Sequence, residues 1–595
     1  MPTSRAEQRS RFIAILLLAA LVSAPAPVAT AAAQTSVRER RATPPATQTP
    51  GRPAPTATPA PTPAPAPSPT PAPARQSPTP DQSPTQSPPA QPAPQPSPQG
   101  SPQSSAQSAS QGGAPKTLEE LRARLRQILD RPEFAASQLA VKVASLDTGR
   151  VIFEENAGKW VQPASNLKLF TVAAALDRFG PDYRFVTSVY APARPDQSGT
   201  VRGDLIVYGR GDPTFATRFN AAGDGDYYRA LDELAAKVYA AGVRRVEGDM
   251  VGDESYFRGS RFAPGWEWDD LQWWYGAEVS ALTINDNSVD LTVRPGARAG
   301  DPAVVTVGPS LPLVTILDRT RTVGRGQGRE LSVHRPLGQN VIEVRGQVPL
   351  DDRGFTASVA VSNPALVFAT MLRTALERRG VVFTGRTRAV TAEDRADGNQ
   401  PLEVSALVEV AARQSPPLSI IAAQTLKPSQ NLYTELLLRA LGKAAGTDPR
   451  LGAEAAGIRA VGDFLTRAGV DPTRVQMLDG SGLSRGNLVT ADATLRLLTY
   501  MNRHPHGYTF REALPVAGVD GTLRNRMKGT AAMNNVRAKT GTLSSATSLS
   551  GYLFTAAGER LAFALFINNP PREADPRANF TDAVAVLLTS FAGRS

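Results

Sequence analysis

The segment PASNLKLF, residues 163–170, places Ser165 and Lys168 three residues apart at the predicted start of a helix. Residues with this spacing share one helix face, so the two side chains can touch. A serine hydroxyl becomes an effective nucleophile when a base takes its proton. A lysine can be that base if burial or a second cation lowers its pKa, whereas an arginine keeps its proton in a protein. The pair therefore predicts nucleophilic catalysis by Ser165 with Lys168 as the base.

Lysine is scarce in this chain, since only nine of its 65 basic residues are lysines. Lys168 alone among them follows a serine at the third preceding position. The competing site would be a Ser-His-Asp triad built on His334, His504 or His506, and the last two of these lie in a polar turn. A metal site would need more ligands than three scattered histidines and acidic residues supply in a chain without cysteine. We therefore favour the serine–lysine pair and expect no metal and no cofactor.

Two further short motifs follow along the chain. Ser429-Gln430-Asn431 is its only S-x-N segment, and Lys539-Thr540-Gly541, on a predicted strand, is its only K-T-G segment. The order S-x-x-K, S-x-N, K-T-G is the set that penicillin-recognising serine enzymes carry. Each motif alone is a weak signal, but three unique motifs in this order make a strong one.

The elements that must position these motifs can be read from patterning. Leu118, Leu121, Leu125 and Ile128 lie on one face of a predicted helix that Thr117 and Glu120 cap. A hairpin is predicted over 139–156, and the helix expected from Pro163 to Gly180 is apolar nearly all round and therefore buried. Residues 187–405 are rich in short β-type runs, helices resume near residue 417, and the last 60 residues predict three strands and a closing helix. We predict an α+β fold, with a helical cluster on an antiparallel sheet and a large β-rich insertion.

The first 115 residues differ in composition from the rest. Arginines followed by a 13-residue apolar run and small residues predict a signal peptide over 1–33, too short to span a bilayer. Residues 44–115 contain 24 of the 52 prolines of the chain. A segment so rich in proline cannot bury a core, so residues 34–115 are predicted to form a disordered linker. We therefore expect export to the periplasm or cell wall, with the signal peptide cleaved.

The net charge argues against one class of partner. The chain carries +11, of which the first 115 residues supply +5, so the remaining 480 carry only about +6. This predicts no binding to nucleic acid and leaves peripheral association with the membrane open.

The spacing of the three motifs indicates which group of penicillin-recognising serine enzymes the chain resembles. Ser165 and Ser429 are 264 residues apart, whereas Ser429 and Lys539 are 110 apart. With the segments KPSQNLYTELLLR, DGSGLSR and VDGTLRNRM, this resembles the D-alanyl-D-alanine carboxypeptidase/endopeptidase family, the low-molecular-mass class C penicillin-binding proteins. The resemblance covers 116–595 and implies a β-lactamase/transpeptidase-like catalytic domain. Its implied domain limits are 116–186 with 406–595 for the catalytic domain, 187–290 with 360–405 for an inserted domain, and 291–359 for a nested small β domain.

The resemblance also implies a role for each motif residue. Ser165 would be acylated and Lys168 would be its base. Ser429 would relay a proton to the leaving amine, and Asn431 would hold the substrate amide.

The K-T-G strand completes the implied site. Lys539 and Thr540, with Gly541, would bind the terminal carboxylate of the substrate. The backbone N–H groups of Ser165 and Thr542 would form the oxyanion hole.

Four residues are expected to receive the side chain of the substrate peptide, which often ends in a free amine in this family. Asp270, with Asp269 as second choice, lies in the tryptophan-rich segment PGWEWDDLQWWYGA and is the expected acceptor. Arg485 of DGSGLSR and Ser544, just past K-T-G, are expected to join it. The competing interpretation of the tryptophans is a buried aromatic anchor between the insertion and the catalytic domain.

The function that follows is a serine D-alanyl-D-alanine carboxypeptidase and DD-endopeptidase. Its partners would be peptidoglycan stem peptides, with β-lactam antibiotics as covalent inhibitors. Two alternatives stay open from the sequence. One is a β-lactamase or esterase on the same fold, and the other is a non-catalytic wall-binding or sensor protein.

Overall fold

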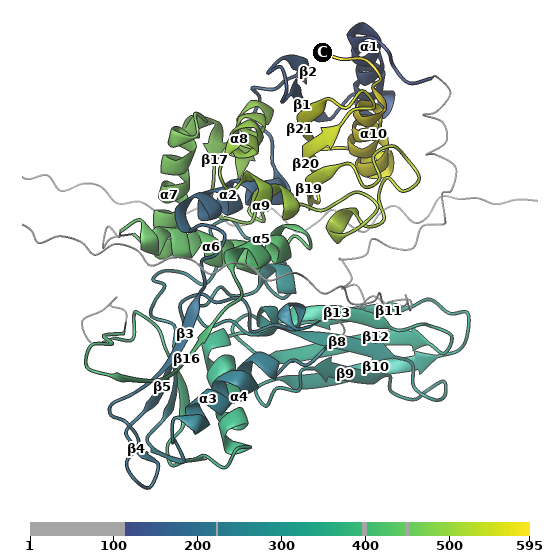
Figure 1. The fold of residues 1–595 in the computed structure, drawn as a ribbon. Coiled ribbons are helices and arrows are strands. Elements are labelled where there is room, and N and C mark those ends of the chain that lie inside the picture. The colour runs from purple at the N-terminus through teal and green to yellow at the C-terminus, as the bar shows by residue number, and fades with distance from the viewer. Residues whose placement is uncertain (1–112, 222–223, 396–401, 447–450) are drawn as a thin grey trace, which may run out of the picture. The chain divides into compact units, whose positions relative to one another are not determined.

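The computed structural model describes residues 113–221, 224–395, 402–446 and 451–595 (Figure 1). The predicted signal peptide and the linker up to residue 112 lie outside these residues. Within the described ranges, no helix is both long and apolar enough to cross a membrane.

A five-stranded antiparallel sheet carries the K-T-G strand at one edge. Its order is β19 (Arg537–Leu543), β20 (Ala546–Phe554), β21 (Arg560–Asn568), β1 (Gln138–Ser145) and β2 (Val151–Glu155). Successive side chains of a strand point to opposite faces, and β21 shows this clearly. Phe563 packs in one core with helices α1 (Leu118–Leu129) and α10 (Ala583–Ser590), while Phe566 packs on the other face with α2 (Lys168–Phe179). The predicted α+β arrangement of helices on an antiparallel sheet is confirmed.

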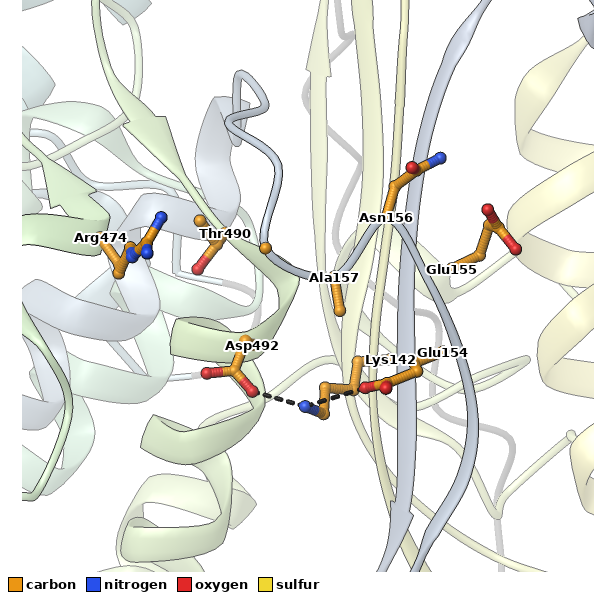
Figure 2. A pocket seen from close by; sticks show the side chains of 9 residues that line it. Lys142, Glu154, Glu155, Asn156, Ala157, Arg474, Thr490 and Asp492 are labelled. Carbon is orange, nitrogen blue, oxygen red and sulfur yellow. Dashed lines mark hydrogen bonds and ion pairs between the residues drawn. The ribbon is translucent and has the colours of Figure 1, made fainter.

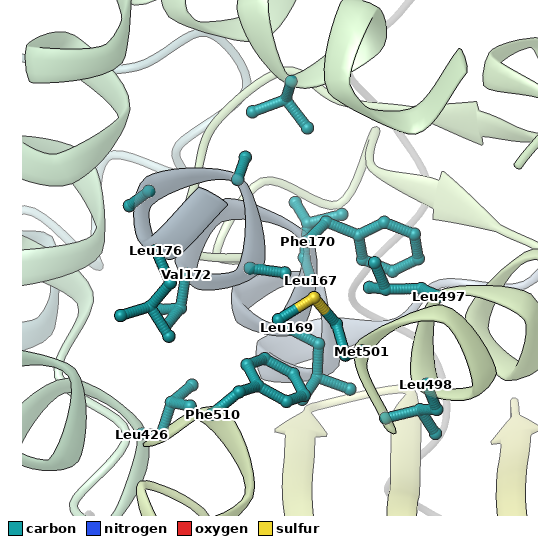
Figure 3. Close-up of a cluster of buried hydrophobic side chains, with 14 of the residues drawn as sticks. Leu167, Leu169, Phe170, Val172, Leu176, Leu426, Leu497, Leu498, Met501 and Phe510 are labelled. Atoms are coloured by element: carbon teal, nitrogen blue, oxygen red, sulfur yellow. The ribbon is translucent and has the colours of Figure 1, made fainter. Parts of the chain in front are cut away.

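Helix α2 lies in the middle of the helical cluster. It begins at Lys168, after a 3₁₀ turn over Ala164–Leu167, so the single helix predicted from Pro163 is in fact two segments. Its core (Figure 3) is completed by α5 (Leu418–Leu426), α8 (Ala491–Arg503) and α9 (Gly507–Glu512). Nine of its twelve residues are buried, as the all-round apolar sequence predicts. Burial of the whole helix also places the Lys168 side chain out of water.

Helices α6 (Asn431–Ala444) and α7 (Ala453–Arg467) cross at two glycines. A Cβ atom on Gly457 would lie 2.1 Å from the Leu438 carbonyl oxygen, and one on Gly442 would lie 2.1 Å from that of Ala453. Neither position has room for a side chain, so the two backbones approach closely. This contact fixes α6, whose first residue belongs to the S-x-N motif. The short strands β17 (Val475–Gln476) and β18 (Leu488–Val489) follow α7 in the chain.

The described residues of the insertion form four sheets and two helices. The helices, α3 (Arg229–Ala240) and α4 (Pro364–Glu377), lie beside the largest of these sheets (Figure 1). That sheet has the order β15 (Thr387–Val390), β7 (Met250–Asp253), β5 (Leu205–Tyr208), β3 (Val186–Ala191) and β16 (Val408–Gln414). Three smaller sheets have three strands each. The first has the order β14 (Val382–Phe383), β6 (Arg245–Glu247) and β4 (Thr200–Arg202), and the second has the order β13 (Phe355–Ala360), β8 (Ser288–Arg294) and β9 (Val304–Gly308). The third has the order β10 (Thr315–Val323), β12 (Val341–Pro349) and β11 (Glu330–His334).

Strand pairing differs from the predicted domain limits at two places. Strand β16 pairs with β3, so the inserted sheet continues past the limit predicted at residue 405. Strands β8 and β13 pair across the limits predicted for the nested domain, 291–359, and Leu291 and Val344 share a core with Phe368 of α4. Pairing between strands that are distant in the sequence leaves no signal in local composition, so these pairings could not be predicted from patterning.

The glycine contact of α7 can be tested with a matched pair of variants in the same helix. Gly457→Ala should lower the free energy of unfolding by about 1–3 kcal/mol, because its methyl group meets the Leu438 carbonyl. Gly462→Ala should raise it by about 0.5–1 kcal/mol, because no atom lies within 4 Å of a Cβ atom there and alanine favours a helix. Urea denaturation measures both, and equal effects would contradict the close crossing.

Candidate active site

The serine and lysine of the first motif lie in direct contact. Lys168 Nζ is 2.8 Å from Ser165 Oγ, and Lys168 is fully buried while Ser165 is half-buried. The same nitrogen donates to Asn431 Oδ1 at 2.6 Å and to the Ser481 carbonyl oxygen at 2.7 Å. A neutral amine has two N–H groups and one lone pair. With both N–H groups held by the two fixed acceptors, the lone pair faces the Ser165 hydroxyl.

Burial changes the charge state of this amine. It lowers the pKa of Lys168 to about 7, although Asp479 and Glu435 act in the opposite direction. About half of the amine is therefore neutral near pH 7, which is what a general base requires. The pKa of Lys539 is likewise well below its usual value, because that side chain is buried and the Lys168 charge lies nearby.

The S-x-N and K-T-G motifs meet at the same place. Lys539 Nζ donates to Ser429 Oγ at 2.8 Å and to the Thr540 carbonyl oxygen at 2.9 Å. Asn431 binds Lys168 through its oxygen, and its Nδ2 donates to the Tyr275 carbonyl oxygen at 2.8 Å. One N–H of the Asn431 amide therefore stays available for a ligand. The structure thus brings together the reactive side chains of all three motifs.

The backbone beside both reactive serines is strained. Ala164, directly before Ser165, has φ +48°, and Ser429 has φ +67°. Residues with a side chain rarely adopt this left-handed region, and surrounding structure must hold them there. Next to Ser165 the support comes from Asn166, whose Nδ2 donates to the Lys539 carbonyl oxygen at 3.1 Å and to Ser548 Oγ at 2.7 Å. The nucleophile is therefore fixed to the sheet through its neighbour.

Thr542 and Gly541 lie on the same strand as Lys539 and Thr540. Gly541 packs so closely that a Cβ atom there would lie 2.6 Å from the Pro163 carbonyl oxygen, while Thr542 is exposed at the mouth of the site. β19 is an edge strand, which leaves backbone groups along its outer side without a strand partner. The backbone N–H of Thr542 as an oxyanion donor stays a prediction.

Sequence reasoning missed the residues that hold the Ser481 carbonyl in place. Glu435 Oε1 accepts from the backbone N–H groups of Gly480 at 3.0 Å and Ser481 at 2.8 Å. Glu435 is fully buried one helical turn after Asn431, and burial raises its pKa. A glutamate directly before the three leucines of α6 was the signal that could have identified it, because an acidic residue is rarely buried without partners. The Ser481 carbonyl itself gives no signal in the sequence.

Two of the four residues predicted to receive the substrate side chain are in contact. Asp270 is buried and forms an ion pair with Arg485, which also pairs with Glu267 at 2.9 Å. Asp269 is exposed beside this pair. Ser544 is exposed in the turn between β19 and β20. Asp270 is thus already committed to Arg485, so the preference for Asp270 over Asp269 as the acceptor loses its basis, and the role of both stays a prediction.

Gln162 joins the two loops that carry Arg485 and Ser544. Its Nε2 donates to the Arg485 carbonyl oxygen at 3.1 Å, and its Oε1 accepts from Ser545 Oγ at 3.3 Å. The tryptophan-rich segment also reaches the catalytic domain, since Trp266 Nε1 donates to Asp479 Oδ2 at 2.9 Å. Trp268 of the same segment is 74% exposed, so the tryptophans do not form one buried anchor.

The other candidates for a functional site are the histidines, possible metal ligands and a separate cavity. His334 is on β11, and His504, at the end of α8, contacts Asp177 at 3.1 Å. In the part of the chain that the structure describes, no three His, Asp or Glu side chains gather as metal ligands. A cavity of about 450 Å³ opens between β1, β2 and the start of α8, where Lys142 bridges Asp492 and Glu154 (Figure 2). Strands β20 and β21 separate β1 from the K-T-G strand, so this cavity is not part of the motif cluster.

Comparison with known proteins agrees with this geometry. The model of the D-Ala-D-Ala carboxypeptidase 3 (S13) family matches residues 121–591. A D-alanyl-D-alanine carboxypeptidase of Actinomadura sp. (strain R39) is 37% identical over 488 residues, which cover 80% of this chain and 86% of that protein. The carboxypeptidase DacB of Haemophilus influenzae is 28% identical over 71% of this chain and 84% of its own length. The crystal structure of penicillin binding protein 4 (dacB) from Haemophilus influenzae matches with a TM-score of 0.66 at 26% identity, covering 77% of this chain and 97% of that chain.

The lowered pKa of Lys168 predicts a pH profile. The rate at which a small activated ester acylates Ser165 should rise with pH with a midpoint near 7, because only the neutral amine can accept the serine proton. Lys168→Arg should lose at least about 100-fold in this rate, since arginine stays charged. Intact-mass measurement at fixed times gives the rates.

Lys443→Arg is the matched control, because Lys443 is a half-buried lysine over the ring of Tyr256. It should keep the wild-type rate and profile. A Lys168→Arg protein that retains the rise near pH 7 would show that another group is the base.

Proposed function

The chain belongs to the D-Ala-D-Ala carboxypeptidase 3 (S13) family, and we propose that it removes the terminal D-Ala of peptidoglycan stem peptides through an acyl-enzyme on Ser165. That it is a serine-type D-Ala-D-Ala carboxypeptidase follows from the family and from the 37% identical relative. The observation that carries the proposal for Ser165 is its contact with the buried amine of Lys168.

The first chemical step transfers a proton and forms a bond. Lys168 Nζ takes the hydroxyl proton of Ser165, and Oγ attacks the carbonyl carbon of the penultimate D-Ala. The negative charge that develops on the carbonyl oxygen would be met by the backbone N–H groups of Ser165 and Thr542, and one such donor contributes about 3 kcal/mol. Asn431 holds the substrate amide with its remaining N–H.

The second step expels D-Ala. Its nitrogen receives the hydroxyl hydrogen of Ser429, and the proton that Lys168 accepted from Ser165 replaces that hydrogen, so that Ser429 is the proposed relay and Lys168 becomes neutral again. Ser429 Oγ accepts from Lys539 Nζ, so its own hydrogen is left to be donated to the leaving nitrogen. Water then attacks the ester on Ser165, releases the shortened peptide and restores the hydroxyl.

The terminal carboxylate is the proposed ligand of the K-T-G strand. The Thr540 hydroxyl is its direct partner in this proposal, and Lys539 lies one residue before it in the strand. Lys539 is fully buried and donates to Ser429 Oγ and to the Thr540 carbonyl oxygen, so in this proposal it supports the pocket through these hydrogen bonds.

The same chemistry extends the proposal to cross-linked peptides and to β-lactams. A cross-link also joins a D-Ala carbonyl to the nitrogen of a D-centre, so the same steps apply to its cleavage. A β-lactam presents an amide carbonyl and a carboxylate at similar positions, and would acylate Ser165. Mass spectrometry of cross-linked muropeptides before and after incubation measures both D-Ala release and cross-link cleavage.

Export to the periplasm or cell wall, where these substrates occur, is part of the proposal. It rests on the sequence of residues 1–33. Peripheral contact with the membrane stays open in the same way.

The acyl-enzyme predicts a single covalent adduct. Penicillin should add one acyl group to the protein, peptide mapping should place it on Ser165, and Ser165→Ala should abolish both the adduct and D-Ala release. Ser198→Ala, in an exposed turn of the insertion, should behave as wild type. An adduct on another serine would refute the assignment of Ser165.

The acidic residues around Arg485 predict a preference for amine-bearing substrates. Glu267, Asp269 and Asp270 supply three carboxylates against one guanidinium. Glu267 and Asp269 are both exposed, and Glu267 already pairs with Arg485. Asp269→Asn should lower kcat/KM by about 2- to 5-fold for peptides with a free side-chain amine, as expected for an exposed ion pair.

The control is the same peptide with its side-chain amine acetylated, for which Asp269→Asn and wild type should be equal. Equal losses with both peptides would mean that Asp269 has no contact with the amine.

A further inference from the structure

Thr522 lies beside the proposed carboxylate pocket, and none of the three motifs includes it. Its Oγ1 is 2.7 Å from Oγ1 of Thr540, the threonine of K-T-G. Thr540 is buried, whereas Thr522 is exposed. The pair therefore runs from the strand to the mouth of the site.

The segment that carries Thr522 is held along the outer edge of β19. Val516 bridges to Arg537 in antiparallel fashion, and Ala538 donates its backbone N–H to the Pro515 carbonyl oxygen at 3.0 Å. Leu523, directly after Thr522, is fully buried in the core between the sheet, α1 and α10. These contacts fix the position of Thr522 along the length of the K-T-G strand.

A second set of contacts fixes it against the S-x-N motif. Thr522 donates its backbone N–H to the carbonyl oxygen of Lys427, two residues before Ser429, at 3.0 Å. Lys427 Nζ donates in return to Asp520 Oδ2 at 2.6 Å. Gly521 between them has φ +55°, and a Cβ atom there would lie 2.5 Å from the Lys427 carbonyl oxygen. Only glycine allows this approach, so the turn is built to place Thr522 at this point.

The hydroxyls of Thr522 and Thr540 can share a hydrogen bond in either direction, and the direction decides whether Thr540 can donate to a ligand. A threonine hydroxyl has one hydrogen to donate and two lone pairs, and a carboxylate only accepts. If Thr540 donated its hydrogen to Thr522, none would remain for the carboxylate. If Thr522 donates to Thr540, the Thr540 hydrogen is directed to the ligand, and the bond to the charged group strengthens the pair.

We propose that Thr522 is a positioning residue for the terminal carboxylate of the substrate, donating its hydroxyl hydrogen to Thr540 so that the Thr540 hydroxyl points at the carboxylate. This inference rests on the proposed function, because it assumes that Thr540 binds the carboxylate. It adds a residue from outside the three motifs to the determinants of carboxylate specificity.

The test compares two substrates and two variants of the full chain. The substrates are an N-acylated peptide ending in D-Ala-D-Ala and the small activated ester without a carboxylate. Thr522→Val keeps the shape and removes the hydroxyl, and Thr522→Ser keeps the hydroxyl. With the peptide, Thr522→Val should lower kcat/KM by about 3- to 10-fold, mainly through KM, while Thr522→Ser stays within about twofold of wild type. With the ester, all three proteins should acylate at the same rate.

Each other outcome overturns the inference in a recognisable way. If Thr522→Val matches wild type on the peptide, or loses equally on peptide and ester, Thr522 does not act through the carboxylate. If Thr522→Ser is as slow as Thr522→Val, the methyl group and not the hydroxyl matters. If the wild-type protein releases no D-Ala, the proposed function fails, and this inference fails with it.

Discussion

The burial of one amine, that of Lys168, sets requirements for the rest of the molecule. An amine out of water keeps a low pKa only while its surroundings stay apolar, and helix α2 meets this by being packed on all sides. The same amine needs two acceptors for its N–H groups, or it would be left unsatisfied. Asn431 supplies one from α6, and the Ser481 carbonyl supplies the other from a loop. The α6–α7 crossing and the bonds from Glu435 to that loop therefore bear directly on the base.

The insertion contributes to this arrangement through one backbone contact and two side-chain contacts. The Tyr275 carbonyl oxygen accepts from Asn431 Nδ2, so a residue of the insertion orients the amide that also binds Lys168. Trp266 donates to Asp479, the carboxylate that lies within the loop of Ser481, and Arg485 of the same loop pairs with Asp270. Three contacts thus connect the segment 266–275 to Asn431 and to the loop that carries Ser481. The inserted domain and the base are parts of one hydrogen-bond network, and a change in either affects the other.

The motifs identified side chains that the structure brings together, and patterning identified much of the fold that carries them, but neither indicated what holds those side chains. Ser165, Lys168, Asn431 and Lys539 belong to local patterns, and the pattern of each also indicates its element. The acceptors from Ser481 and Tyr275 are carbonyl groups, which every residue has, so no residue type marks them. Asp270 was expected to accept the substrate amine with Arg485 nearby, and in the structure it forms an ion pair with Arg485 itself. The distance between residues 270 and 485 depends on how the insertion folds, so the sequence does not show this pairing. The pairing of β16 with β3, over 200 residues apart, is of the same kind, because no local pattern in the sequence indicates it.

Two glycines of the motif segments, Gly541 of K-T-G and Gly482 of DGSGLSR, serve close packing and not chemistry. A Cβ atom on Gly541 would lie 2.6 Å from the Pro163 carbonyl oxygen, and one on Gly482 would lie 1.9 Å from that of Ala164. Both glycines therefore allow other segments to pack against the strained turn before Ser165, where Ala164 has φ +48°. A side chain at either position would push this turn away from β19 or from the Ser481 loop. The third residue of K-T-G is thus explained by packing alone. Because Gly541 has no side chain, the strand that carries Lys539 and Thr540 can approach the turn before Ser165.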